Sequence, residues 1–218
     1  MAHRAIVLAN GELGEIETQR ARLKGWGKAL IVAADGGSRH AAALGLPIHV
    51  VIGDLDSLDE TNRAALSAGG THFEVAPAHK DETDLELALL YAVQQGADEI
   101  AVLGALGGRL DMALANVLLL AHPRLAGAHI ELWSGGQTAW LIRPPGGEVK
   151  GQPGDTLSLI PLGGEAGGIT TQGLEYPLKD GTLIFGPARG VSNVLTGKLA
   201  HVELKQGLLL AVHTPGRA

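Results

Sequence analysis

The sequence contains no cysteine. It therefore forms no disulfide and has neither a thiolate nucleophile nor a thiolate metal ligand. Any metal ion must be held by oxygen or imidazole ligands, as hard divalent cations commonly are. The composition is also compatible with a reducing compartment.

Basic clusters and long apolar runs are absent as well. The formal net charge is -6 and no run of lysine or arginine occurs, so the electrostatic footprint of a nucleic-acid-binding protein is missing. The first apolar run, Ala5 to Ala9, is far shorter than the core of a signal peptide or a membrane span. We therefore expect a cytoplasmic protein that acts on small molecules and has neither nucleic acid nor a membrane as partner.

Apolar side chains are plentiful enough for a folded core. Hydrophobic residues make up 45% and charged residues 18% of the 218 residues, which excludes a disordered chain. This length is compatible with one large domain or two modest ones. The pattern along the chain favours two.

Residues 1–135 alternate short apolar segments with helical patterns, which is typical of a parallel sheet with flanking helices. The sequence predicts helices at Ser38 to Leu44, Glu82 to Gln95 and about Leu110 to Ala121. It predicts six strands, at Ala5 to Ala9, Ala29 to Ala34, His49 to Ile52, His72 to Ala76, Glu99 to Leu103 and His129 to Trp133. The expected fold class of this part is α/β, with a six-stranded, mostly parallel sheet.

Residues 136–218 have a different texture, with frequent glycine and proline and no amphipathic helix. The expected architecture is a separate all-β sandwich domain. Its predicted strands are Thr138 to Ile142, Asp155 to Pro161, Gly168 to Thr171, Thr182 to Phe185, His201 to Leu204 and Leu208 to His213.

Aspartates follow successive strands of the predicted parallel sheet. Ligands of such sheets bind beyond the carboxyl ends of the strands, so these side chains are expected at one edge. Carboxylates gathered there repel one another unless a cation neutralises them, and Mg²⁺ suits oxygen ligands. Asp54 and Asp56, alternate residues of a segment taken as extended, would point to the same side and hold one metal ion or two. The set is Asp35, Asp54, Asp56, Asp84 and Asp111.

Each position also has a simpler structural interpretation. Ser57 with Glu60, and Thr83 with Glu86, fit the capping box, so these hydroxyls could serve only to start helices. An aspartate pair also occurs in phosphatases that use its first member as a nucleophile, although there it usually follows an early strand rather than the third. The argument for a metal site therefore depends on the set.

A glycine-rich segment supplies the second half of a phosphate site. Gly104, Gly107 and Gly108 precede the predicted helix at Leu110, so backbone amides and the side chain of Arg109 could bind an anion. Taken alone, these glycines are better explained by a tight turn. The lysine-bearing phosphate loop and the dinucleotide fingerprint are both absent. These residues together indicate metal-assisted phosphoryl chemistry.

Four segments, in this order, resemble the thiamin pyrophosphokinase family. They are Asp35-Gly36-Gly37, Gly53-Asp54-Leu55-Asp56-Ser57, Lys80-Asp81-Glu82-Thr83-Asp84 and Gly107-Gly108-Arg109-Leu110-Asp111. In the β-rich half, Gly190-Val191-Ser192-Asn193 is similar to the family's segment near the thiamin pocket. The ordered set is much more specific than any one member.

The resemblance implies an α/β catalytic domain, a thiamin-binding β-sandwich and a homodimer whose active sites each lie between two subunits. It implies that the hydroxyl of thiamin attacks the β-phosphorus of the co-substrate ATP and that AMP leaves. Mg²⁺ would be held by Asp54, Asp56 and Asp84, and Arg109 with Asp111 would complete the catalytic set. The implied cofactor-binding residues are Asp35, Gly36, Gly37, Asp54, Thr83, Gly107 and Arg109 for the nucleotide, and Ser192 and Asn193 for thiamin.

Some alternatives stay open at this stage. Met112 stands where bacterial relatives often have histidine, which leaves no imidazole role at that position. Asp84 and Asp111 are the candidates for a general base. The rival functions are a pyrophosphokinase for a pterin alcohol on the same scaffold, and a non-catalytic nucleotide or thiamin sensor. A dehydrogenase is disfavoured, because the dinucleotide fingerprint is missing.

Overall fold

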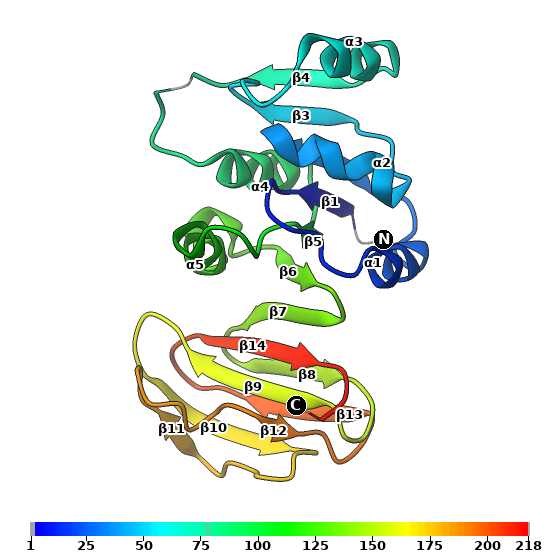
Figure 1. The fold of residues 1–218 in the computed structure, drawn as a ribbon. Helices are drawn as coiled ribbons and strands as arrows, with labels where there is room; N and C mark the ends of the chain where they lie inside the picture. Colours follow the sequence, from blue (N-terminus) through cyan, green and yellow to red (C-terminus); the bar gives the residue numbers. More distant parts are fainter. Residues whose placement is uncertain (1–2, 78, 218) are drawn as a thin grey trace. The chain divides into compact units, whose positions relative to one another are not determined.

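The computed structural model describes residues 3–77 and 79–217. The chain divides into two compact units, Met1–Gly135 and Gly136–Ala218 (Figure 1). Among the described residues, no helix is long and apolar enough to cross a membrane. Each unit has its own buried core.

The first unit is built on six parallel strands. Their order in the sheet is β6-β5-β1-β2-β3-β4, and every described pair in this series is parallel. The chain places β2, β3 and β4 on one side of β1 and then continues with β5 on the other, so the switch point lies between β1 and β5. The strands are β1 (Arg4–Leu8), β2 (Leu30–Ala34), β3 (Val50–Gly53), β4 (His72–Val75), β5 (Glu99–Leu103) and β6 (His129–Ser134).

Helices connect these strands, which confirms the α/β fold class. The longest, α4, buries Leu85, Ala88 and Leu89 and packs against β1, β2 and β3. The helices are α1 (Ile16–Lys24), α2 (His40–Leu44), α3 (Glu60–Ala68), α4 (Asp84–Gln94) and α5 (Leu110–Leu119), with short 3₁₀ helices η1 (Asp35–Arg39) and η2 (Pro123–Leu125).

The ends of two helices test the capping predictions. Thr83 is the N-cap of α4, and its hydroxyl oxygen accepts a hydrogen bond from the backbone N–H of Glu86 at 3.2 Å, as predicted. The prediction for Ser57 was wrong. Helix α3 begins at Glu60, and its N-cap is Asp59, because a carboxylate stands nearer the first turn and accepts from the Asn62 N–H.

The second unit is an antiparallel β-sandwich, as predicted. One layer has the order β11-β10-β13-β8, and in the other β12, β9, β14 and β7 are successive neighbours. Buried residues from both layers, such as Leu157, Leu159, Ile169 and Val202, form one core. The strands are β7 (Gln137–Ile142), β8 (Gly146–Lys150), β9 (Thr156–Pro161), β10 (Ala166–Gln172), β11 (Gly181–Leu183), β12 (Asn193–Val194), β13 (Leu199–Glu203) and β14 (Leu209–Thr214).

Candidate active site

The loops after β1 and β5 are joined by backbone hydrogen bonds at the switch point of the sheet. The N–H of Gly11 donates to Gly104 O at 2.7 Å, and that of Glu12 donates to Leu106 O at 3.0 Å. Arg39 Nη2 donates to Asn10 O at 2.8 Å, and His40 Nε2 donates to Gly11 O at 2.9 Å. These contacts fix the floor on which a ligand would lie.

A cavity of about 430 Å³ opens over this floor. It lies where parallel α/β sheets commonly bind their ligands. Its wall combines carboxylates, backbone of the glycine-rich loop and one guanidinium. The lining residues that matter for the chemistry are Asn10, Gly11, Asp35, Thr83, Asp84, Gly107, Gly108, Arg109, Met112 and Asn116.

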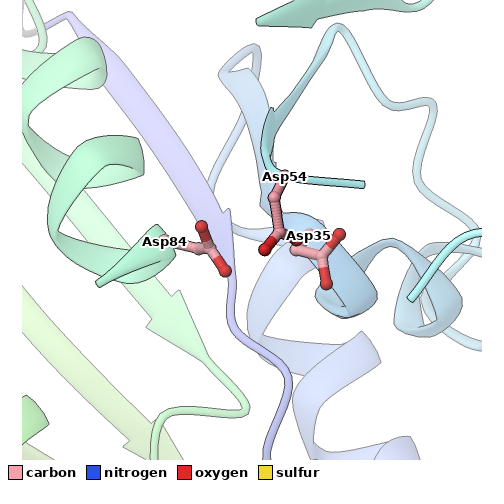
Figure 2. A group of neighbouring side chains, drawn as sticks. All are labelled: Asp35, Asp54 and Asp84. Atoms are coloured by element: carbon pink, nitrogen blue, oxygen red, sulfur yellow. The ribbon is translucent and has the colours of Figure 1, made fainter. Parts of the chain in front are cut away.

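Three carboxylates converge beside this cavity. Figure 2 shows that Asp35, Asp54 and Asp84 approach one another from the ends of β2 and β3 and the start of α4. One carboxylate oxygen from each lies within 4.8 Å of the others. We call these residues the acidic triad. Like charges at such distances repel one another strongly, so the arrangement favours a bound cation.

Two further observations indicate that a metal ion fits the acidic triad. Asp35 is only 5% exposed, and its Oδ1 is buried and accepts no hydrogen bond, whereas Oδ1 of Asp84 is paired with Lys80 Nζ at 2.8 Å. Gly53 lies between these side chains, where a Cβ would come within 2.8 Å of the Asp35 Cβ and 3.2 Å of the Asp84 Oδ1. The glycine thus keeps the space between the carboxylates open. Converging carboxylate oxygens around an open space, one of them buried and unpaired, match the oxygen-ligand preference of Mg²⁺.

Asp56 and Asp111 lie outside the acidic triad. Leu55 has a φ of 63°, so the segment from Asp54 to Asp56 is not extended, and the premise that placed both carboxylates on one side does not hold. Asp56 is exposed and accepts a hydrogen bond from Ser57 Oγ at 3.2 Å. Asp111 is also exposed, and it accepts two hydrogen bonds from Arg109, at 3.1 and 2.6 Å.

The Arg109–Asp111 pair has an electrostatic consequence. The guanidinium of Arg109, with a contribution from the Met112 N–H, lowers the pKa of Asp111, and the carboxylate in turn raises the pKa of Arg109. Both side chains therefore stay charged near neutral pH. Arg109 precedes the first residue of α5 and lines the cavity, where its guanidinium is available for an anion.

Gly36 and Gly37 allow the start of η1 to approach the end of β1. A Cβ on Gly36 would lie 2.5 Å from the Asn10 Nδ2, and one on Gly37 would overlap the carbonyl oxygen of Leu8. Both glycines are buried. Their role in the structure is to let Asp35 leave β2 beside β1 without a side chain in between.

In the second unit, Ser192 and Asn193 are adjacent but differ in their contacts. Ser192 is exposed, has a φ of 61°, and its N–H donates to Ser158 Oγ at 3.1 Å. The side chain of Asn193 accepts from the Tyr176 N–H at 3.0 Å and donates to Tyr176 O at 2.7 Å. Asn193 therefore positions the loop that carries the exposed Tyr176 ring.

Three residues of the site were not predicted as functional. Asn10 follows β1, and the rule applied to the later strands would have found it. Asn116 is a buried polar residue in a helix of mostly apolar residues, and its Nδ2 donates to Ala105 O at 2.7 Å. Lys80 belongs to one of the four segments that resemble the family, but no role was assigned to it. The structure places its Nζ 2.8 Å from Asp84 Oδ1.

Family models match both units of the chain. Residues 24–132 match "Thiamin pyrophosphokinase, catalytic domain" and residues 147–209 match "Thiamin pyrophosphokinase, vitamin B1 binding domain". The chain belongs to the thiamin pyrophosphokinase family. The resemblance in the sequence is thereby confirmed, and with it the assignment of the chain as a transferase of the thiamin pyrophosphokinase type. The matched ranges contain the acidic triad in the first case and Ser192 and Asn193 in the second.

Individual members of the thiamin pyrophosphokinase family are similar in sequence and fold. The thiamine pyrophosphokinase of Bacillus subtilis is 28% identical over 163 residues, which cover 74% of this chain and 76% of that protein. Thiamine pyrophosphokinase 1 of Oryza sativa is 26% identical over 173 residues, covering 75% of this chain and 65% of that protein.

Solved structures extend the similarity over nearly the whole chain. The crystal structure of the Bacillus subtilis enzyme superimposes with a TM-score of 0.85 at 25% identity, covering 97% of this chain and 99% of the other. That of the Enterococcus faecalis family member gives a TM-score of 0.82 at 26% identity, covering 98% and 99%. The architecture of the thiamin pyrophosphokinase family therefore applies to both units.

Proposed function

We propose that the chain transfers the diphosphate group of ATP to the hydroxyl group of thiamin, giving thiamin diphosphate and AMP. The observation that carries this proposal is the acidic triad beside a cavity that also contains Gly107, Gly108 and Arg109. Diphosphate transfer requires in-line positioning and neutralisation of phosphate charge, with little covalent chemistry from the protein. The cavity offers both groups of residues that this requires.

For the metal, we propose Mg²⁺ held by Asp54 and Asp84 together with Asp35. When bound, the ion would neutralise charge on the phosphate oxygens. The support is that all three carboxylates converge and that Oδ1 of Asp35 is buried without a hydrogen bond. The carboxylate of Asp56 is exposed and lies outside the acidic triad. Its role as a metal ligand is therefore a separate proposal, with its own test.

For the phosphates of ATP, we propose the loop at Gly107 and Gly108, the guanidinium of Arg109 and the start of α5. Gly107 has a φ of 86° and Gly108 one of 68°, a conformation that lets backbone N–H groups face a ligand. The N-terminus of α5 adds the positive end of a helix dipole. Asp35, Gly36, Gly37 and Thr83 would border the same nucleotide.

For the general base, we favour Asp84 over Asp111. Arg109 lowers the pKa of Asp111, which makes that carboxylate a weak proton acceptor at neutral pH. Asp84 lines the cavity and Asp111 does not, although Oδ1 of Asp84 is paired with Lys80 Nζ at 2.8 Å. Its place beside the cavity makes Asp84 the candidate that accepts the proton leaving the thiamin hydroxyl, or that orients this hydroxyl.

For thiamin, we propose the second unit, at Ser192 and Asn193, and a homodimer whose active sites are each shared between two copies. Exposed apolar side chains in both units support a second copy as the partner. Leu110, Leu114 and Leu118 are spaced four residues apart on α5 and are 84%, 58% and 49% exposed. In the second unit Tyr176, Ile184 and Phe185 are each more than 60% exposed.

The test is a product analysis with purified protein, Mg²⁺ and ATP, with thiamin or a pterin alcohol as acceptor. We expect thiamin diphosphate and AMP from thiamin, and no product from the pterin alcohol. Loss of product in a folded Asp54→Ala variant would connect the reaction to the acidic triad. Activity only with the pterin alcohol, or thiamin binding without turnover, would overturn the proposal.

A further inference from the structure

A cationic side chain lies next to the acidic triad, the ammonium group of Lys80. Lys80 lies in the segment between β4 and α4, four residues before Asp84, and its Nζ is 2.8 Å from Asp84 Oδ1. Its side chain is only 12% exposed, although lysine is almost never buried unless it is paired. A lysine held this way indicates a specific role at the site.

The charges at this place balance only in part. The ammonium group of Lys80 faces the carboxylate of Asp84 at 2.8 Å, and the carboxylates of Asp35 and Asp54 complete the acidic triad around Asp84. A lysine side chain is positively charged at neutral pH. Three carboxylates and one ammonium leave two negative charges, which a single divalent ion would neutralise.

The contact between Lys80 and Asp84 is one that can be exchanged. Lys80 Nζ lies 2.8 Å from Asp84 Oδ1, within hydrogen-bond and ion-pair distance. The lysine side chain is a compact charge on a flexible four-carbon stem, and it is a common phosphate ligand in other sites. Asp84 itself lines the cavity, so the ammonium group paired with it lies next to the wall of that space.

We propose that Lys80 is the resident counter-ion of the acidic triad, which holds Asp84 in the absence of metal and contacts a phosphate group of the nucleotide once a divalent ion has bound. Lys80 is thus a competitor of the metal ion and a ligand of the substrate. This inference rests on the proposed function for its second half. The first half concerns metal binding alone.

The test uses a Lys80→Met variant of the whole chain, with Mn²⁺ alone and inorganic pyrophosphate as probes. Lys24→Met is the matched control, because it removes one positive charge from the exposed end of α1. We expect Lys80→Met to bind Mn²⁺ about tenfold more tightly, measured by electron paramagnetic resonance, because the competing charge is gone. We expect it to bind pyrophosphate in the presence of Mn²⁺ about tenfold more weakly.

A thermal unfolding series extends the test. In EDTA, Lys80→Met should melt at a lower temperature than the parent protein, since three carboxylates then repel one another, and Mn²⁺ should remove most of the difference. If Lys80→Met does not fold, Lys80→Gln is measured with the same expectations. Unchanged or weaker Mn²⁺ binding would overturn the inference, as would equal effects in Lys24→Met.

The two proposals can fail separately. Tighter Mn²⁺ binding together with weaker pyrophosphate binding, in a protein that makes no thiamin diphosphate, would support the role of Lys80 and refute the proposed function. Normal thiamin diphosphate synthesis by Lys80→Met, with Mn²⁺ and pyrophosphate binding like that of the parent protein, would support the proposed function and refute the role of Lys80.

Discussion

Asp35 was expected among the carboxylates at the sheet edge and, by the resemblance, at the nucleotide. Its carboxylate joins those of Asp54 and Asp84, and it is 5% exposed. Its backbone has a φ of 43°, a conformation that asparagine also adopts. Asp35→Asn therefore removes the charge with little change to the backbone.

We predict that Asp35→Asn unfolds at the same or a higher temperature than the parent protein in EDTA, because one of three neighbouring carboxylates is neutralised. We predict that added Mg²⁺ raises the melting temperature of the parent and has little effect on the variant. Turnover should fall by roughly 100-fold or more. If Mg²⁺ stabilises Asp35→Asn as much as it stabilises the parent protein, Asp35 is not a ligand of the metal ion.

The sequence showed which residue types gather at the sheet edge but not which of them meet. Five aspartates following strands were identified, and three of them converge. The distinction between Asp54 and Asp56 depends on one backbone angle, the positive φ of Leu55. A leucine in this conformation is rare, so sequence patterns give no warning of it.

At the scale of elements, the buried Asp155 ties the end of the chain to the sandwich. Its carboxylate accepts from the N–H groups of Gln152 at 2.7 Å and Gly216 at 2.8 Å, and from His213 Nε2 at 2.9 Å. Burial raises the pKa of Asp155, but these hydrogen bonds together outweigh it, so the pKa is lower than usual.

The lowered pKa predicts how stability depends on pH. The contribution of Asp155 is present above the unfolded pKa of about 3.9 and is lost as the pH falls through the lower folded value. Asp155→Asn should therefore cost about 2 kcal/mol at pH 7 and much less below about pH 3. Denaturant titrations of both proteins across this range measure the difference, and a cost independent of pH would contradict the assignment.

A second element-scale prediction concerns the approach of η1 to β1. Gly37→Ala would bring a methyl group onto the carbonyl oxygen of Leu8, and we expect a loss of about 3 kcal/mol in the free energy of unfolding. Gly127→Ala is the control, because its Cβ would meet no atom within 4 Å. The control should change stability by no more than about 0.5 kcal/mol. Equal effects at both positions would show that the close approach is unimportant.

Elements with a clear apolar pattern were predictable, and those without one were not. All six strands of the first unit were predicted to within one or two residues at each end. Helix α3 was not predicted as an element, although the capping box at Ser57 and Glu60 indicated a helix start nearby; none of its residues is buried, and Leu66 is its one large apolar side chain. Strand β8 was missed because it begins with Gly146-Gly147, a pair that usually marks a turn.

At the scale of the whole molecule, the leucines of α5 predict the oligomeric state. We expect the protein to sediment as a dimer, and Leu114→Glu to shift it toward the monomer, since a charge would be buried in the interface. Thr61→Glu on the exposed side of α3 is the matched control and should leave the dimer intact. A parent protein that is monomeric at micromolar concentration would contradict the proposed dimer.

The measurement that tests the central claim most directly is the fate of labelled phosphate. The protein is incubated with thiamin, Mg²⁺ and ATP carrying ³²P at the β-position, and the products are separated. We predict that the label appears in thiamin diphosphate and that the AMP is unlabelled, because the whole diphosphate moves. Labelled ADP together with unlabelled thiamin monophosphate would mean attack at the γ-phosphorus and would contradict the proposed reaction.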